Sequence, residues 1–405
     1  MTRSVIVNPR RRALLAATAL AAVGALTLTA CGGDADADND KKGASAAAKG
    51  ADITISSKDG ATDASINATG VKVKHGKLTS VKMTSVTSGA AVEGSISADG
   101  TSWKPKAQLE RGTKYKVTAN AKDAKGNAAT ENATFTTVSS ANSFIGSYTP
   151  DGGAKVGVGM PVSFNFDKAI TEKKDVQSHI TVTSSSGQKV VGHWFGNQRL
   201  DFRPEEYWKA GSKVTMKINL DGVKGGDGIT GVQHKTVTFT VGRAQVSTVD
   251  VKTKKMTVER DGKVIKTIPI SAGSPSNPTY NGKMVISEKF TQTRMNGDTV
   301  GFGGEYDIKD VPHAMRLSTS GTFIHGNYWG SPSIFGSANT SHGCVGLQDA
   351  RGAGDPNTMG AWFFNNSLIG DVVTVTGSPD KTIAPDNGLN GWNMSWSEWT
   401  AGSAT

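Results

Sequence analysis

The chain has 405 residues, enough for about two to four compact domains rather than one small one. Its 49 glycines, 7% aromatic residues and 20% charged residues are typical of short strands and many turns, and they argue against a chain disordered throughout. The formal net charge is +10, and the region after residue 30 carries +6 of it. Its lysines are scattered singly rather than clustered with aromatic residues, so we expect no nucleic-acid partner, whereas an anionic polymer is compatible.

Residues 1–30 have the pattern of an export signal. A basic stretch ending in Arg10–Arg12 precedes the apolar run 13–28, which is too short and alanine-rich for a membrane span. The segment ends in Leu-Thr-Ala-Cys31-Gly, which resembles a bacterial lipobox. We therefore expect lipidation of Cys31 and anchoring to the outer face of the cell membrane, in the cell-wall space. The alternative is an ordinary signal peptide with an incidental cysteine, and the arginine run also permits twin-arginine export.

After a predicted flexible tether at 31–50, the sequence alternates polar and apolar residues in short runs as far as Arg243. Several short patterns in this region recur further along the chain. Trp103-Lys-Pro105 is repeated as Phe202-Arg-Pro204, and Gly112-Thr-Lys-Tyr115 as Gly211-Ser-Lys-Val214, both at an offset of 99 residues. This is the length of one immunoglobulin-like sandwich. We predict two tandem immunoglobulin-like β-sandwiches, at 51–140 and 141–244, which act as spacers.

A third, β-rich domain is predicted at 245–377. Its first signals are a strand pattern at 251–258, a turn at 260–262 and a second strand at 264–268, which together predict a hairpin. Further strand-like runs follow, and residues 360–368 are the best candidate for a short helix, so we expect one or two helices. The strand-like runs are 283–287, 322–325 and 371–376.

The tail, 378–405, contains Trp392, Trp396 and Trp399. The last two stand three residues apart, as on one face of a helix. We expect this segment to dock on its own domain, and carbohydrate stacking is the alternative.

A cluster of reactive residues lies within 322–347. Lipidation of Cys31 would leave Cys344 without a disulfide partner, and His325 and His342 both lie within 20 residues of it. A thiol nucleophile needs a neighbouring base, and flanking glycines allow a substrate backbone to approach closely. The spacing alone leaves a buried, inert thiol as an equal alternative. A zinc site is disfavoured because a fourth ligand is missing, so we expect no metal and no cofactor.

The strand ending at His325 would present that imidazole at a sheet edge, beside a loop that bears Cys344. His342, two residues from the cysteine, is the weaker candidate for the base, since a tight turn would leave it holding the loop by hydrogen bonds. The backbone N–H groups around Gly343, Cys344 and Val345 are the expected oxyanion donors.

The combination of Ile324-His325-Gly326, a spacer of about 14 residues and Ser341-His342-Gly343-Cys344-Val345 resembles the signature of the L,D-transpeptidase catalytic domain. The stretch 277–282 resembles the Thr-Pro-x-Gly element of that family. With the lipobox, the two sandwiches and the tryptophan-rich tail, nearly the whole chain resembles the actinobacterial branch.

The resemblance implies an enzyme that acts on peptidoglycan stem peptides. Cys344 would attack the carbonyl of the L-centre of diaminopimelate in a donor tetrapeptide, releasing D-Ala and forming a thioester. His325 would act as base and then acid, while the carbonyl of Gly326 orients the imidazole. The side-chain amine of an acceptor diaminopimelate would resolve the thioester into a 3→3 cross-link. Carbapenems would acylate the same cysteine.

The resemblance also carries over to substrate-binding positions: Tyr306 as a lid residue, and Ser320, Gly321, Ser341, Gly343 and Gly346 lining the site. There is one departure. Many members have Arg or Asn two residues after the cysteine, where this chain has Gly346, so a contact to substrate is missing or comes from elsewhere. Arg316 could supply it, or could simply form a salt bridge.

Two alternatives stay open. Water could resolve the thioester, which would make the protein an L,D-carboxypeptidase. A non-catalytic cell-wall-binding lipoprotein, in which the immunoglobulin-like modules do the binding, is the other, and it predicts that Cys344 is dispensable. Replacement of Cys344 by alanine separates it from both enzymatic functions.

Overall fold

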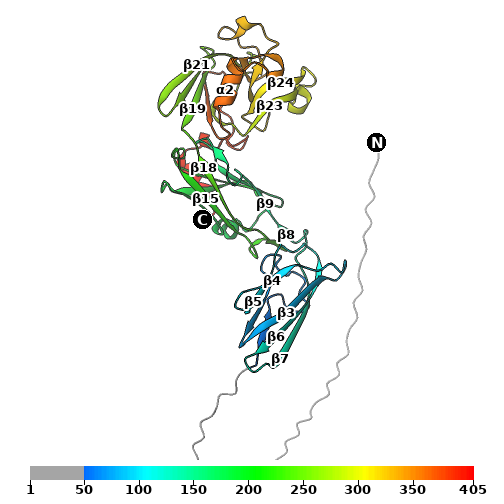
Figure 1. The fold of residues 1–405 in the computed structure, drawn as a ribbon. Coiled ribbons are helices and arrows are strands. Elements are labelled where there is room, and N and C mark those ends of the chain that lie inside the picture. Colours follow the sequence, from blue (N-terminus) through cyan, green and yellow to red (C-terminus); the bar gives the residue numbers. More distant parts are fainter. Residues whose placement is uncertain (1–49) are drawn as a thin grey trace, which may run out of the picture. The chain divides into compact units, whose positions relative to one another are not determined.

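A computed structural model describes residues 50–405 (Figure 1). The predicted signal peptide, the lipidation site Cys31 and the tether up to residue 49 lie outside the described residues. None of the helices within 50–405 is long and apolar enough to cross a membrane. The prediction of a mainly β chain with few helices is confirmed.

The N-terminal body consists of strands β1–β7, which form two sheets. One sheet has the order β1-β2-β5-β4 and the other the order β3-β6-β7. The strands are β1 (Asp52–Ile55), β2 (Val71–Lys74), β3 (Gly76–Ser85), β4 (Gly94–Ile96), β5 (Ser102–Pro105), β6 (Lys114–Asp123) and β7 (Ala128–Thr136). Buried side chains of both sheets, among them Trp103 and Phe135, share one apolar core.

The middle body has two four-stranded sheets, β13-β14-β11-β9 and β10-β18-β15-β12, and a small sheet β16-β17-β8. Its elements are β8 (Ser143–Phe144), β9 (Gly146–Thr149), β10 (Lys155–Val156), β11 (Val162–Phe166), α1 (Lys173–Ser178), β12 (Ile180–Ser184), β13 (Val190–Phe195), β14 (Arg199–Pro204), β15 (Lys213–Asn219), β16 (Lys224–Gly226), β17 (Ile229–Gly231) and β18 (His234–Val241).

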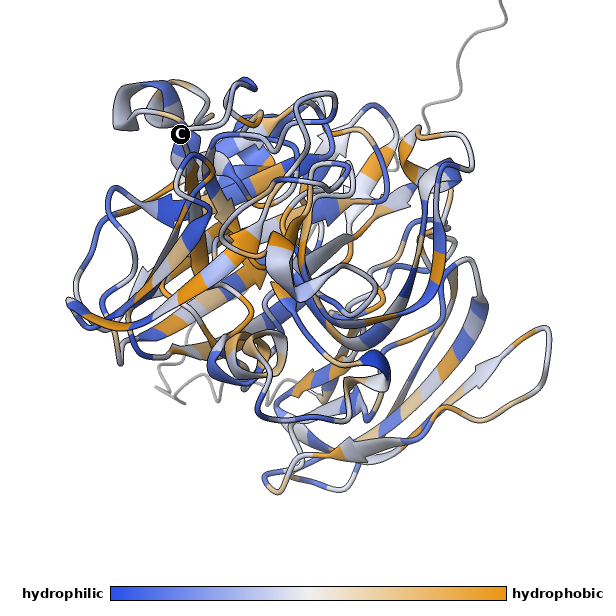
Figure 2. Ribbon diagram, turned by 90° about the horizontal axis from the view of Figure 1, so that it is seen from above, coloured by the Kyte–Doolittle hydropathy of each residue, from blue (hydrophilic) through white to orange (hydrophobic). Residues whose placement is uncertain are grey.

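The period-two pattern that predicted these strands has a simple physical origin, visible in β15. Val214, Met216 and Ile218 are fully buried, while Lys213, Lys217 and Asn219 are exposed, because successive side chains of a strand point to opposite faces. Figure 2 shows hydrophobic and hydrophilic residues alternating along strands. The repeated motifs fall on strands β5 and β14 and on the starts of β6 and β15. The division into two immunoglobulin-like domains, with its boundaries, stays a prediction.

The C-terminal body contains a nine-stranded sheet with the order β22-β27-β19-β20-β21-β26-β25-β24-β23. Its strands are β19 (Gln245–Asp250), β20 (Lys255–Arg260), β21 (Lys263–Ser271), β22 (Gly282–Val285), β23 (Glu288–Asn296), β24 (Asp307–Arg316), β25 (Phe323–Asn327), β26 (Val345–Gln348) and β27 (Val372–Thr376). It also contains α2 (Met359–Asn366) and the 3-10 turns η1 (Gly297–Val300), η2 (Pro332–Ile334) and η3 (Arg351–Ala353), and the tail that follows carries η4 (Gly391–Asn393) and α3 (Trp396–Ala401). The predicted hairpin is present as β20–β21, although its first strand begins at Lys255, because residues 251–254 form a turn.

The sequence suggested that the tryptophan-rich tail docks on its own domain. In the structure the tail also docks on the middle body. The indole N–H of Trp392 donates to the carbonyl of Gly159 at 2.7 Å, and that of Trp399 to Val191 at 3.0 Å. The guanidinium of Arg203 lies 4.3–5.5 Å from the ring centroids of all three tail tryptophans. Cation–π stacking and these hydrogen bonds therefore tie the tail to the middle body.

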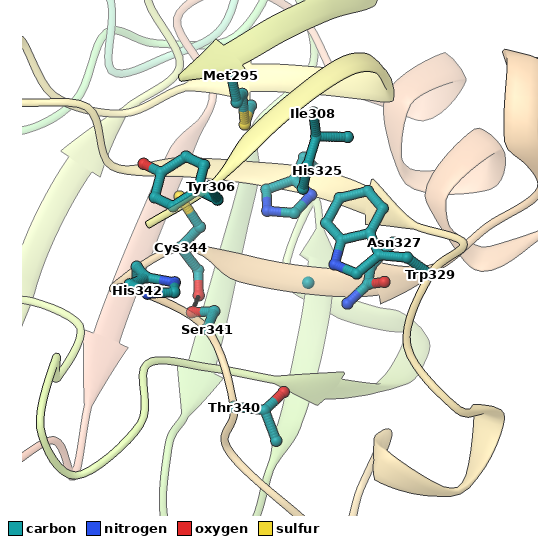
Figure 3. Close-up of a pocket in the computed structure, with 11 residues that line it drawn as sticks. Met295, Tyr306, Ile308, His325, Asn327, Trp329, Thr340, Ser341, His342 and Cys344 are labelled. Carbon is teal, nitrogen blue, oxygen red and sulfur yellow. Dashed lines mark hydrogen bonds between the residues drawn. The ribbon is translucent and has the colours of Figure 1, made fainter. Parts of the chain in front are cut away.

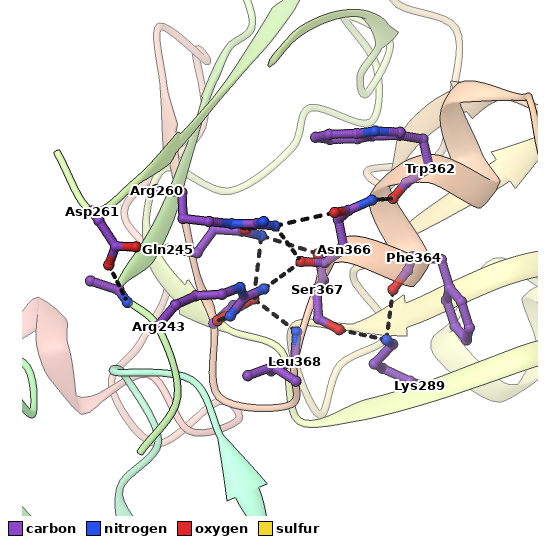
Figure 4. A network of polar contacts seen from close by, with 12 residues as sticks. Arg243, Gln245, Arg260, Asp261, Lys289, Trp362, Phe364, Asn366, Ser367 and Leu368 are labelled. Atoms are coloured by element: carbon purple, nitrogen blue, oxygen red, sulfur yellow. Dashed lines mark hydrogen bonds and ion pairs between the residues drawn. The ribbon is translucent and has the colours of Figure 1, made fainter. Parts of the chain in front are cut away.

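A second link joins the middle and C-terminal bodies at Arg243 (Figure 4). Its guanidinium donates twice to the Asp371 carboxylate, at 2.9 and 2.7 Å, and also reaches the carbonyl of Asn366. Asp371 is 2% exposed, and its burial raises the pKa of its carboxyl despite the neighbouring Arg243. The carboxylate thus depends on Arg243 for its charge compensation.

We expect Arg243→Ala to cost about 3 kcal/mol of stability, because it leaves the Asp371 charge buried without its partner. Urea denaturation of wild type and variant measures the loss. A matched control is Lys106→Ala, which removes an ion pair with Glu93 between two exposed side chains and should cost under about 1 kcal/mol. Equal losses in the two variants would contradict the role given to Arg243.

Candidate active site

The reactive residues of the sequence come together where two parallel strands lie side by side. Strand β25 carries His325, and Cys344 immediately precedes β26; the register pairs Ile324 with Val345 and His325 with Gly346. The expectation that His325 stands at a sheet edge is wrong: β25 is an interior strand, between β24 and β26. Parallel pairing brings the cysteine loop to the imidazole, and pairing on both sides fixes the strand.

These residues line a cavity of about 170 Å³ (Figure 3). Six of the predicted site residues are among its walls, together with five residues that the sequence did not point to. The predicted ones are Tyr306, His325, Ser341, His342, Cys344 and Gly346; the others are Met295, Ile308, Asn327, Trp329 and Thr340.

The imidazole of His325 is held in one orientation. Its Nδ1 lies 2.8 Å from the carbonyl oxygen of Gly326, so Nδ1 carries the proton and Nε2 keeps a free lone pair. The ring is 5% exposed and stacks on the indole of Trp329, with 5.6 Å between centroids. Burial lowers the pKa of His325 from its ordinary value of 6.5, with smaller opposing effects from the Gly326 hydrogen bond and the charge of Asp349. The imidazole is therefore neutral at neutral pH and able to accept a proton.

The thiol of Cys344 does not bond to the imidazole. It donates instead to the carbonyl of Gly321, with 3.6 Å between sulfur and oxygen, and within residues 50–405 it has no hydrogen bond to His325. Burial raises the pKa of the thiol to about 11. The resting site thus holds a neutral thiol and a neutral imidazole, and the S–H must turn away from the Gly321 carbonyl before its proton can pass to His325.

His342 faces the loop that covers the cavity rather than the cysteine. Its Nε2 lies 2.9 Å from a carboxylate oxygen of Glu305, and its ring packs 5.2 Å from Phe302 and 5.0 Å from Tyr306. Burial, and to a lesser degree Cys344 and Glu305, raises the pKa of Tyr306 to about 12. His342 therefore fits the loop-holding role that its place in a tight turn indicated, with Tyr306 kept as a neutral phenol above the thiol.

The turn before Cys344 is braced by Ser341. Its hydroxyl donates to the carbonyl of Cys344 at 2.6 Å and accepts from the N–H of Gly343 at 3.2 Å. Gly343 has φ +108°, a conformation that disfavours any other residue. Of the three expected oxyanion donors, the N–H of Gly343 is already bonded to Ser341, and Val345 is part of strand β26. The N–H of Cys344 has no hydrogen bond within the described chain, so it is the best candidate for the oxyanion donor.

The stretch resembling the Thr-Pro-x-Gly element supports the same turn from behind. Thr279 is fully buried, and its hydroxyl accepts a hydrogen bond from the N–H of Gly273, which forms a bridge with Ser341. This stretch braces the cysteine turn without lining the cavity.

Two further sequence expectations come out differently. Ser320 is exposed and exchanges hydrogen bonds with Asn387 away from the cavity, whereas Gly321 contributes the carbonyl that receives the thiol. Arg316 forms an ion pair with Glu288 and does not line the cavity, so it does not supply the contact missing at Gly346. The salt-bridge alternative for Arg316 is the one observed.

A buried polar pair, which the sequence did not indicate, lies behind the imidazole. Nδ1 of His313 is 2.8 Å from a carboxylate oxygen of Asp349, and both side chains are under 10% exposed. A Cβ atom placed on Gly326 would lie 2.1 Å from the same oxygen, so Asp349 packs directly on the backbone that orients His325. In the part of the chain described by the structure, no three His, Cys, Asp or Glu residues are grouped as a metal site would require.

Comparisons with known proteins identify what this chain is similar to. The family model described as the L,D-transpeptidase catalytic domain matches residues 244–375, and the model described as Bacterial Ig domain matches 61–224 as one segment. The chain is 33% identical to L,D-transpeptidase 2 of Mycobacterium tuberculosis, covering 87% of this chain and 85% of that protein. It is 29% identical to L,D-transpeptidase 5 of the same species, with coverages of 82% and 72%. A solved LD transpeptidase in complex with imipenem matches with 28% identity, 57% and 97% coverage and a TM-score of 0.47.

Proposed function

Because this chain belongs to the L,D-transpeptidase family, we propose that it forms 3→3 cross-links between peptidoglycan stem peptides through a thioester on Cys344. The observation that carries the proposal is the shared cavity, in which a thiol and an imidazole with a free Nε2 face the same space. A neutral imidazole next to a thiol is the arrangement of nucleophilic acyl transfer. The site needs no cofactor for this chemistry.

The reaction would begin when the thiol rotates away from the Gly321 carbonyl and passes its proton to Nε2 of His325. The sulfur attacks the carbonyl carbon at the L-centre of the donor diaminopimelate, and the N–H of Cys344 is placed to stabilise the oxyanion. When the tetrahedral intermediate collapses, the C–N bond to D-Ala breaks. The imidazolium of His325 then protonates the leaving amine, which leaves a thioester and a neutral histidine.

The second half would reverse these roles. The side-chain amine of an acceptor diaminopimelate attacks the thioester carbonyl and gives its proton to His325. The C–S bond breaks, and the proton returns to the sulfur, so that a new amide joins the two stems and the free thiol is regenerated. The carbonyl of Gly326 keeps Nδ1 protonated throughout, which leaves Nε2 as the basic nitrogen of the ring.

A further part of the proposal concerns the location of the enzyme, and another concerns the competing hydrolysis of the thioester. We propose that the chain is exported and lipid-anchored through Cys31, which would hold the enzyme at the outer face of the cell membrane, next to its substrate. Hydrolysis of the thioester by water would make the enzyme an L,D-carboxypeptidase. Tyr306 and His342 line the cavity that holds Cys344, and their rings pack against each other and against Phe302. These aromatic walls favour transpeptidation because they limit the water around the thioester.

The test is mass spectrometry of the protein mixed with a carbapenem, imipenem, and separately with a disaccharide-tetrapeptide. We expect an increase in mass by one whole carbapenem, located on the peptide that contains Cys344, and release of D-Ala from the tetrapeptide with formation of a dimer. The variant Cys344→Ala should lose both reactions.

Each other outcome has a clear meaning. D-Ala release without dimer would select the carboxypeptidase. No adduct and an intact tetrapeptide with the wild-type protein would refute the catalytic function and favour the wall-binding lipoprotein.

A further inference from the structure

Asn327 presents two unused hydrogen-bond donors to the cavity. It lies two residues after His325 on β25, so both side chains point to the same face of the sheet. Its Oδ1 accepts from the N–H of Gly330 at 2.8 Å, which fixes the amide with Nδ2 on the opposite side. Within residues 50–405, Nδ2 has no hydrogen-bond partner, although the side chain is only 9% exposed and lines the cavity.

Gly346, on the neighbouring strand β26, makes room for this amide. Gly346 pairs with His325 across β25 and β26, and a Cβ atom placed on it would lie 3.6 Å from both Cβ and Nδ2 of Asn327. The φ of Gly346 is not positive, and the atom nearest to such a Cβ, the carbonyl oxygen of Ser271, would be 3.4 Å away. Neither the backbone nor a clash therefore requires glycine here. Because Gly346 has no side chain, the space next to Asn327 stays open.

Trp329 adds a third donor to the same region. Its indole is 43% exposed and stacks on His325, and its Nε1–H has no hydrogen bond in the described structure. Figure 3 shows this nitrogen and Nδ2 of Asn327 pointing to the same side, into the cavity. Both donors are uncharged, and no lysine or arginine among residues 50–405 lines the cavity. Such a site binds an acceptor oxygen without demanding that it be charged.

We propose that Asn327, with Trp329, forms a donor subsite over Gly346 that binds the carboxyl or carboxamide oxygen on the side chain of the diaminopimelate attacked by Cys344. Asn327 thereby supplies from β25 the contact that Gly346 on β26 cannot make. This inference rests on the proposed function. It makes Asn327 a substrate-binding residue. Because its donors are neutral, the subsite accepts a carboxylate and a carboxamide alike.

The first test exchanges the side chain between the two strands. We expect Asn327→Ala to raise KM for the disaccharide-tetrapeptide about three- to tenfold, since one neutral hydrogen bond is lost. The double variant Asn327→Ala with Gly346→Asn should bring KM back to within about threefold of wild type, because the amide then enters the same space from β26. Gly346→Asn alone should crowd Asn327 and raise KM.

A second variant guards against a loss caused by misfolding. Asn327→Asp has nearly the same shape and keeps an acceptor for the Gly330 N–H, but it removes both donors and adds a negative charge. We expect its KM to rise at least tenfold for a donor with a free side-chain carboxylate, and less for the same donor with a carboxamide. Wild type should accept both donors with KM values within about threefold.

The outcomes separate the two levels of the proposal. If wild type forms no thioester with either donor, the proposed function fails. If wild type reacts but Asn327→Ala leaves KM unchanged, or the double variant is no better than the single one, the subsite is refuted while the function stands. A loss confined to kcat, with KM unchanged in all variants, would also refute it.

Discussion

Replacing His325 by glutamine should lower the rate of thioester formation by about 10²–10⁴-fold, the usual contribution of a general base. Partial burial of Cys344 raises the pKa of its thiol to about 11, so almost none of it is ionised at neutral pH. Without a base to take the proton, attack would depend on that small thiolate fraction. Single-turnover acylation by imipenem, followed by mass spectrometry, measures the loss.

The pH dependence gives the same assignment a second test. His325 must be neutral to accept the thiol proton, so the rate should fall as pH drops through the pKa of this histidine. Because burial lowers that pKa, the acid limb should lie below 6.5 rather than near it. Between this limb and the titration of the thiol near 11, the rate should be flat. An acid limb above 6.5 would contradict the assignment.

Stability provides a control on that acid limb. Because burial lowers the pKa of His325 in the folded protein, this histidine binds its proton more readily in the unfolded chain. Its contribution to the free energy of unfolding is therefore complete above pH 6.5 and is lost as the pH falls from there towards the pKa of the folded protein. Unfolding measured over the same range separates loss of fold from loss of catalysis. His342→Gln is the matched variant, because this ring bonds to Glu305. A larger loss in His342→Gln than in His325→Gln would reverse the choice of base.

Much of this site could be predicted from the sequence, because its reactive residues lie within one short motif. Residue types, spacing and the family resemblance together pointed to Cys344 and His325 as a pair, and the short alternating runs predicted a part of the strands, among them β25 and β27. The walls of the cavity could not be predicted, because the register of β25 against β26 places Asn327 there and stacking on His325 places Trp329. The orientation of the thiol towards Gly321 likewise depends on packing between distant segments.

Two other differences have the same cause. Arg316 was within reach of the motif by sequence, but Glu288 on the neighbouring strand β23 holds it. The tail tryptophans suggested a docking segment without identifying Arg203 as their partner, since nothing local in the sequence relates residues almost 200 positions apart. Long-range pairing decides both contacts, and a periodic pattern reports only on local structure.

Asp349 should be the most sensitive position of the catalytic region for stability. One carboxylate oxygen bonds to Nδ1 of His313, and the other accepts from the N–H of Ala350 and the hydroxyl of Thr358. Thr358 also caps the start of α2. We expect Asp349→Ala to cost about 3–5 kcal/mol, because it leaves His313 buried without its partner. The urea dependence of hydrogen exchange in β25 and β26 measures this locally.

The matched control is Asp307→Ala, which breaks the ion pair with Arg294 between two side chains that are each at least 40% exposed and should cost less than about 1 kcal/mol. Asp349→Asn keeps the shape but removes the charge that supports protonation of His325, so its acid limb should shift to still lower pH. Equal exchange protection in Asp349→Ala and Asp307→Ala would contradict the stabilising role. An unshifted acid limb in Asp349→Asn would show instead that Asp349 acts on the fold alone, because a carboxylate that sets the pKa of His325 cannot be neutralised without changing the proton affinity of its imidazole.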